Sequence, residues 1–120
     1  MKIQQSAENY LETIFMLSKK NGSVRSVDIA NELGFSKPSV SIAMKNLREN
    51  GYIDVLGDGS ITLLEPGREI AEKLYAKHTI LSEALIMLGV SRETAVEDAC
   101  KIEHILSEES FNAIKKHLGK

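Results

Sequence analysis

The side chains best suited to chemistry in this 120-residue chain lie near residue 100, in the run Asp98-Ala99-Cys100-Lys101-Ile102-Glu103-His104. On a helix, Cys100, Glu103 and His104 stand at positions i, i+3 and i+4, so they share one face within reach of a single ion. Thiolate, carboxylate and imidazole donors together suit a divalent transition metal. A further donor, His78, falls on the apolar stripe of an earlier predicted helix. A lone histidine there, or a lone cysteine, is more often a buried core residue, so the metal prediction rests on the whole set.

The N-terminal segment holds two further donors, Asn9 and Glu12, which are three residues apart. They share a helix face and would complete a coordination shell if that helix packs across the body of the protein. The same pattern equally describes an ordinary polar face, which the residues alone favour.

The first half of the chain supplies the elements of a winged helix-turn-helix. Apolar periodicity predicts helices over residues 6–20, 26–33 and 36–50, with Ser6 and Ser36 as N-caps. Two β-rich runs, 53–56 and 61–64, flank Gly57-Asp58-Gly59-Ser60, which is typical of a hairpin turn.

The second half predicts three more helices, over about 65–88, 91–106 and 107–118, with Ser91 and Ser107 as N-caps. The expected fold is mostly α with a small β-hairpin. It comprises a winged helix-turn-helix DNA-binding domain (residues 1–65) and an all-helical metal-binding and dimerisation domain (residues 66–120). The last two helices carry more apolar surface than one small body can cover, which predicts a homodimer.

The helix after the Gly34 turn is the predicted DNA-reading element. Small hydroxyls permit close approach to the groove, cations suit phosphates, and an apolar side chain suits a thymine methyl group. The residues predicted to face DNA are Ser36, Lys37, Pro38, Ser39, Ser41, Ile42, Lys45 and, nearer the end of the helix, Arg48. The hairpin tip carries Asp58 and no Lys or Arg, so strong contact of the wing with phosphate is not expected.

Composition narrows the class of protein. Apolar residues make up 42% and charged residues 27%, which is ordinary for a folded domain. Residues 1–50 hold seven Lys or Arg against five Asp or Glu, whereas residues 51–120 hold eight against twelve. This asymmetry suits a DNA-binding head on an acidic body. The chain has no apolar run of membrane-spanning length or signal-peptide pattern, and a single cysteine, so we expect a cytoplasmic protein with no membrane partner.

The chain resembles the iron- and manganese-dependent repressor family, the diphtheria-toxin-repressor type that includes the manganese transport regulators. The resemblance is carried by residues 6–14, 27–30, 36–41, 77–78 and 97–104, in the family order. It implies a homodimeric winged-helix repressor that binds a palindromic double-stranded DNA operator when loaded with Fe(II) or Mn(II). The SH3-like domain of the longer members is not represented, so a short form is expected.

The resemblance also implies metal ligands at His78, Cys100, Glu103 and His104, with Glu12 matching a ligand of the manganese branch. Asn9 stands at a ligand position that is methionine in one branch and aspartate in the other. Cysteine at position 100 follows the iron branch and favours Fe(II) over Mn(II), with Co(II), Ni(II) or Zn(II) substituting in vitro. Ser82 and Val96 stand where the iron branch has further ligands, so the chain mixes features of both branches.

Three other readings are consistent with parts of the sequence. The first is a winged-helix regulator that responds to a small organic ligand or to oxidation. The second is a protein-interaction module, since three-helix winged domains also serve in assemblies. The third is a metalloenzyme, but the chain contains no His-Glu-x-x-His run or nucleophile motif, so no enzyme activity and no small organic substrate are expected.

Overall fold

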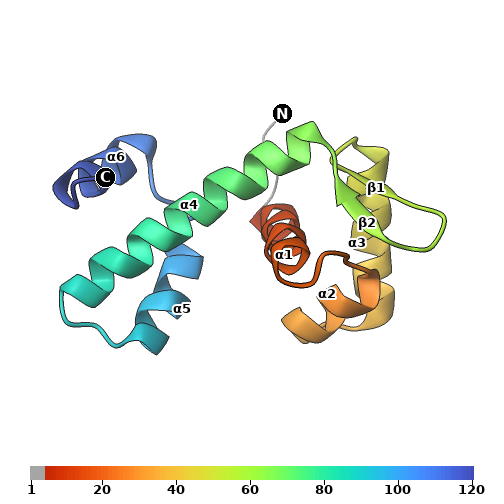
Figure 1. The fold of residues 1–120 in the computed structure, drawn as a ribbon, viewed down its shortest axis with the longest axis horizontal. Coiled ribbons are helices and arrows are strands. Elements are labelled where there is room, and N and C mark those ends of the chain that lie inside the picture. The colour runs from red at the N-terminus through yellow and green to blue at the C-terminus, as the bar shows by residue number, and fades with distance from the viewer. Residues whose placement is uncertain (1–4) are drawn as a thin grey trace. The chain divides into compact units, whose positions relative to one another are not determined.

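The computed structural model describes residues 5–120 and shows a mostly helical chain with one small hairpin (Figure 1). The elements are α1 (Gln5–Asn21), α2 (Ser26–Leu33), α3 (Lys37–Glu49), β1 (Ile53–Val55), β2 (Ile61–Leu63), α4 (Glu65–Met87), α5 (Arg92–Ile102) and α6 (Glu108–His117). The chain divides into two compact units, Met1–Glu72 and Lys73–Lys120, with the division inside α4. The predicted fold class, a winged helix-turn-helix followed by a helical domain, is confirmed.

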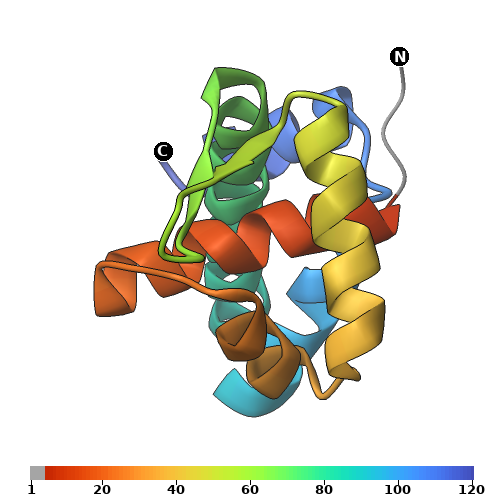
Figure 2. The same cartoon turned by 90° about the vertical axis from the view of Figure 1, so that its right-hand side faces the viewer.

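The first unit packs α1, α2, α3 and the hairpin around one apolar core. Figure 2 shows α1 crossing α3 at a steep angle. The side chains at the centre are fully buried because each apolar stripe faces the same interior. They include Leu11, Ile14, Val24, Ile29, Val40 and Ile53.

Glycine and serine set the turn of the helix-turn-helix. Gly34 ends α2 in the left-handed conformation (φ 70°), which a side chain would disfavour. Ser36 then caps α3, where its Oγ accepts the backbone N–H of Ser39 at 3.3 Å. The core side of α3 buries Val40, Met44 and Leu47, so the opposite side of this helix faces solvent.

The hairpin is antiparallel, with Ile53 opposite Leu63 and Val55 opposite Ile61. Ile53 and Ile61 are buried, which attaches the hairpin to the core. At its tip, the Asp58 carboxylate accepts the backbone N–H of Ser60 at 2.9 Å, and this hydrogen bond lowers the pKa of Asp58. The wing tip is therefore anionic at neutral pH.

The second unit consists of the later part of α4 with α5 and α6. Ser91 and Ser107 cap α5 and α6 by accepting the backbone N–H groups of Thr94 and Ser110, as their positions predict. Lys77 on α4 lies 3.2 Å from Glu108 and 5.7 Å from the centre of the Phe111 ring, so it attaches α6 to α4. Among the described helices, none combines the length and apolar character needed to cross a membrane.

Two predicted helix boundaries are wrong. In the described part of the chain, α1 already includes Gln5, so Ser6 lies inside the helix and does not cap it. α5 ends at Ile102 and not near Leu106, because the next backbone hydrogen bonds form a turn in which the N–H groups of Ile105 and Leu106 share the carbonyl of Ile102. The domain boundary after residue 65 stays a prediction, and residues 1–4 of the predicted first domain lie outside the described part.

Candidate metal centre and DNA-reading helix

The Glu103 carboxylate lies between two imidazole rings of the second unit. Its Oε2 is 3.2 Å from Nδ1 of His78, and its Oε1 is 3.5 Å from Nε2 of His104. The Glu103 side chain is fully buried, and those of His78 and His104 are only 16% and 2% exposed. Three predicted ligands from two segments therefore meet at one buried point.

The local chain path explains this arrangement. His78 projects from the middle of α4, while Glu103 follows the last residue of α5 and keeps a helical hydrogen bond from its N–H to the carbonyl of Ala99. The backbone then leaves the helix, so Glu103 and His104 occupy a turn and not the continuous helix that their spacing predicts. The turn leaves Ile105 exposed and holds both donors inward.

Cys100 lies within α5, three residues before Glu103, and it is exposed. The thiol therefore differs in burial from the other three donors of the second unit. Ligation by Cys100 stays a prediction.

Asn9 and Glu12 lie less than one helical turn apart on α1, in the first unit. Glu12 is only 4% exposed although it is ionisable, whereas Asn9 is half-buried. A carboxylate is rarely buried to this extent unless it is paired or coordinates a cation. The predicted ligand role of both residues remains a prediction.

The donor chemistry of the buried centre fits a divalent transition metal. A carboxylate removed from water needs a compensating positive charge, and imidazole nitrogens are strong ligands for Mn, Fe, Co and Zn ions. His78, Glu103 and His104 would hold such an ion through two nitrogens and one or two oxygens. The addition of the Cys100 thiolate would make the site softer.

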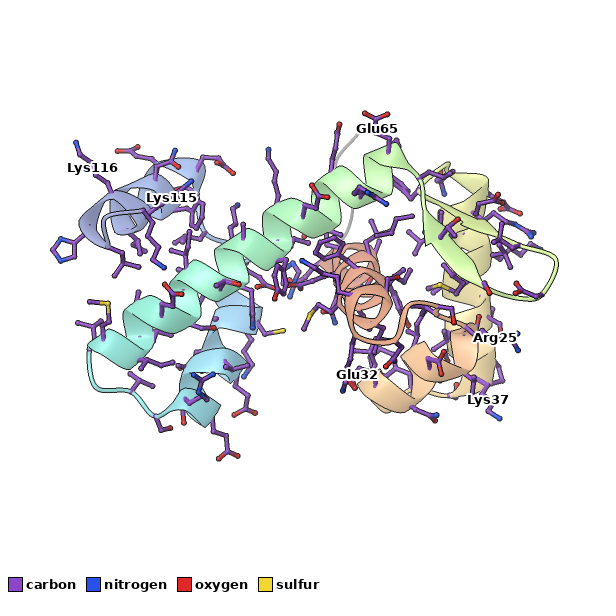
Figure 3. All side chains as sticks on the ribbon, in the orientation of Figure 1. Arg25, Glu32, Lys37, Glu65, Lys115 and Lys116 are labelled. Atoms are coloured by element: carbon purple, nitrogen blue, oxygen red, sulfur yellow. The ribbon has the colours of Figure 1, made fainter. Side chains whose placement is uncertain are left out.

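The predicted DNA-facing side of α3 is exposed along its whole length. Figure 3 shows Lys37 projecting outward from the start of this helix. Ile42 is 63% exposed, which is unusual for an isoleucine on a helix that packs on a core. The remaining predicted residues Ser36, Pro38, Ser39, Ser41, Lys45 and Arg48 are likewise exposed.

Sequence reasoning predicted no separate role for Lys77, although this residue directly precedes His78. Its side chain is only 14% exposed and holds α6 against α4 through Glu108 and Phe111. The only sequence feature that points to this contact is the acidic first turn of α6, after its Ser107 cap. This feature does not indicate which basic residue pairs with it.

These features define a class of protein: a winged-helix unit joined to a helical unit that contains a buried carboxylate–imidazole cluster suited to a divalent cation. Comparison with known proteins agrees with this class. Residues 2–61 match the family "Iron dependent repressor, N-terminal DNA binding domain". Residues 64–120 match "Iron dependent repressor, metal binding and dimerisation domain".

Individual relatives give the same result. An HTH-type transcriptional regulator of Methanocaldococcus jannaschii is 35% identical over 120 residues, which cover 98% of this chain and 96% of the relative. The transcriptional regulator MntR of Escherichia coli O157:H7 is 35% identical over 108 residues, covering 90% of this chain and 70% of the relative. The solved structure of a manganese-dependent transcriptional repressor in complex with manganese superposes with a TM-score of 0.86 at 27% identity, covering 94% of this chain and 52% of that one.

The chain therefore belongs to the iron-dependent repressor family of metal-dependent, DNA-binding transcriptional regulators, which are not enzymes. It spans about half the length of several solved relatives that it matches, such as the manganese regulator SloR, of which it covers 55%.

Proposed function

We propose that this protein is a homodimeric repressor that binds a palindromic operator when loaded with Fe(II) or Mn(II) and so controls metal homeostasis. The observation that carries this proposal is the buried Glu103 carboxylate between His78 and His104, in a chain that also exposes a DNA-reading helix. A buried carboxylate flanked by two imidazoles is better explained as a cation-binding site than as part of a purely structural core.

The proposed ligands come from both units of the chain. His78, Cys100, Glu103 and His104 belong to the helical unit, while α1 contributes Glu12 and Asn9. When bound, the divalent ion supplies the positive charge that the buried carboxylates require. Ligands from both units would then favour one arrangement of the DNA-reading heads over others, and linkage requires operator DNA to tighten metal binding by the same factor.

α3 is the proposed reader of the major groove. The hydroxyls of Ser39 and Ser41 and the methyl groups of Ile42 face the bases, and Lys37 and Lys45 contact phosphates. Two such helices in a dimer must lie about 34 Å apart to enter successive major grooves. The anionic tip of the wing at Asp58 makes α3, and not the hairpin, the main contact with DNA.

The metal preference follows from the softness of the ligands. With Cys100 as a ligand, the site would contain one sulfur, two nitrogens and carboxylate oxygens, which favours Fe(II) over Mn(II). Without Cys100, only nitrogen and oxygen donors remain, and Mn(II) becomes the better match. Comparison of Cys100→Ser with the unmodified protein in Fe(II) and Mn(II) titrations decides between them.

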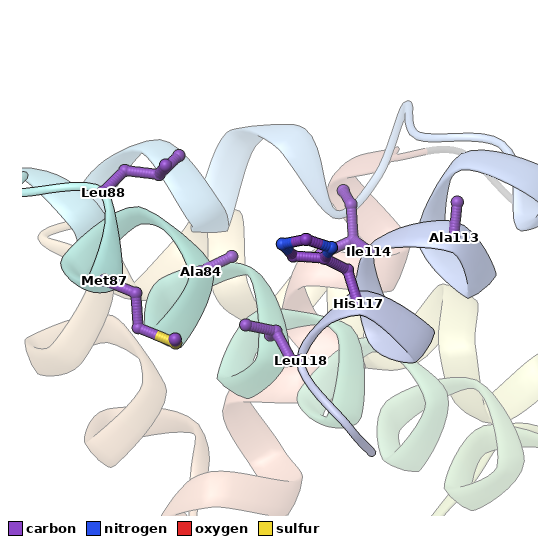
Figure 4. A pocket seen from close by; sticks show the side chains of 7 residues that line it. All are labelled: Ala84, Met87, Leu88, Ala113, Ile114, His117 and Leu118. Carbon is purple, nitrogen blue, oxygen red and sulfur yellow. The ribbon is translucent and has the colours of Figure 1, made fainter.

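The dimer surface is proposed to include an apolar groove between the end of α4 and α6 (Figure 4). The groove has a volume of about 490 Å³. It is lined by Ala84, Met87, Leu88, Ala113, Ile114, His117 and Leu118. Met87 and Leu88 are 74% and 81% exposed in one copy of the chain, and exposed large apolar side chains of this kind mark protein interfaces.

The same groove supports one alternative, a regulator that responds to a small apolar ligand. Its volume lies within the range of small-molecule sites, and His117 supplies a polar group at its edge. Isothermal titration with Mn(II) and Co(II) separates the two functions, because the alternative predicts no binding of either ion at the buried histidines.

The decisive experiment measures operator affinity with and without metal. Genomic fragments bound by the protein in Mn(II) would be selected and their core sequence used in fluorescence anisotropy titrations. We expect metal to raise the affinity roughly 5- to 150-fold, the usual range of coupling between two sites. Equal affinity in Mn(II) and in chelator would refute the proposal, as would a His104→Ala variant that keeps the full metal response.

A further inference from the structure

Ser82 is a buried polar residue with no role in the proposal above. It lies on α4, is only 8% exposed, and its Oγ is shielded from solvent without a hydrogen-bond partner. A helical serine usually resolves this situation by donating to the carbonyl four residues earlier, and Ser82 does not. A buried hydroxyl without a partner destabilises a protein, so its presence points to a partner that one copy of the chain does not supply.

Helix geometry places this hydroxyl beside the metal centre. Ser82 follows His78 by four residues on the same continuous helix, so the two side chains share one face about one turn apart. The short turn after α4 sends α5 back in roughly the opposite direction (Figure 1). His78 meets Glu103, so Ser82 lies about one turn of α4 from this contact.

The Ser82 hydroxyl has no hydrogen-bond partner on the described residues. One turn earlier on the same face of α4, His78 lies 3.2 Å from the Glu103 carboxylate and supplies polar groups close to this hydroxyl. From this position the Ser82 hydroxyl could orient metal ligands, or water bound to the ion.

We infer that the Ser82 hydroxyl is a positioning group for the bound divalent cation, with a hydrogen bond to an oxygen of the metal-loaded centre. The inference rests on the proposed metal function and extends it to a residue outside the ligand set. Groups in this position usually change metal affinity 10- to 100-fold when removed. The hydroxyl therefore carries an unfavourable burial in the metal-free protein and a favourable contact in the loaded one.

The test is Ser82→Ala in the full chain, with two measurements that move in different directions. Thermal unfolding in chelator should show equal or higher stability than the unmodified protein, because an unsatisfied buried hydroxyl is replaced by a methyl group and alanine favours helices. Isothermal titration with Mn(II) and with Co(II) should show affinity lower by roughly tenfold. A structural serine would give lower stability in chelator with unchanged affinity, and that result would overturn the inference.

Thr79→Ala is the matched control. This hydroxyl lies on the same helix, is exposed, and donates to the carbonyl of Tyr75 at 3.0 Å, so its loss should leave metal affinity unchanged. An equal loss of affinity in the Thr79 and Ser82 variants would also overturn the inference, because it would show a general effect on α4. If the unmodified protein binds neither ion, the proposed function itself fails. If the unmodified protein and Ser82→Ala bind the ions equally well, only the inference about Ser82 fails.

Discussion

Replacement of Glu103 by glutamine tests the metal centre most directly. Glutamine has the same shape, so the contacts with His78 and His104 can persist while the negative charge is lost. The side chain is fully buried, so water does not screen the difference between the two residues. The change therefore removes the anionic ligand and leaves the turn after α5 in place.

The expected magnitude follows from the burial of the group. Loss of one partner from a buried charge pair costs about 3–5 kcal/mol, which is at least about 100-fold in affinity. At a Mn(II) concentration of about 100 times the dissociation constant, the unmodified protein gains about 2.7 kcal/mol of stability. At the same concentration, Glu103→Gln gains only about 0.4 kcal/mol.

Thermal unfolding followed by circular dichroism, with Mn(II) and with chelator, measures this difference. For a chain of this length, the unmodified protein should gain roughly 10 °C in Tm and Glu103→Gln less than about 2 °C. Glu97→Gln, an exposed residue on α5, is the matched control and should keep the full gain. If Glu103→Gln shows the same rise in Tm as the unmodified protein, the buried carboxylate is not a ligand and the proposed switch is refuted.

Three further predictions concern DNA binding, assembly and folding. Lys45→Ala should weaken operator binding about equally for all DNA sequences and reduce the slope of log affinity against log salt concentration by about 1. Anisotropy titrations over a series of salt concentrations measure this slope. An unchanged slope would show that Lys45 touches no phosphate. Met87→Asp should convert the proposed dimer to a monomer, as measured by sedimentation velocity. Met16 is an exposed methionine on α1, so Met16→Asp should leave the dimer intact. A Met87→Asp variant that stays dimeric would exclude the groove as the interface. Gly67→Ala should lower the free energy of unfolding, measured by urea titration, by roughly 1–2 kcal/mol. The added Cβ would lie 2.3 Å from the carbonyl oxygen of Tyr52, and this clash outweighs the higher helix propensity of alanine. A more stable variant would show that the backbone at this position can relax.

Local sequence signals predicted most of the elements. The caps at Ser36, Ser91 and Ser107 are confirmed, since each hydroxyl accepts the N–H three residues later. The hairpin between the two β-rich runs is confirmed as well, with Gly59 in the positive-φ conformation at its tip. These features are predictable because they depend on a few neighbouring residues whose own conformational preferences are strong.

The end of α5 was not predictable in this way. Between Ala99 and Leu106 the chain has no glycine, proline or capping residue that signals a helix end, so periodicity extended the helix to Leu106. The chain turns after Ile102 and leaves Ile105 77% exposed. Packing of the second unit overrides local propensity here.

The sequence by itself determined the order of the elements, the side of α3 proposed to read DNA and a set of candidate metal donors, because these depend on residue type and short-range spacing. Only the tertiary structure decided that His78 reaches Glu103 across 25 residues of chain, and that the Cys100 side chain is exposed while its neighbouring donors are buried. These outcomes depend on how α4 packs against α5 and on where α5 ends. They are set by contacts between segments distant in the chain, which no local pattern encodes.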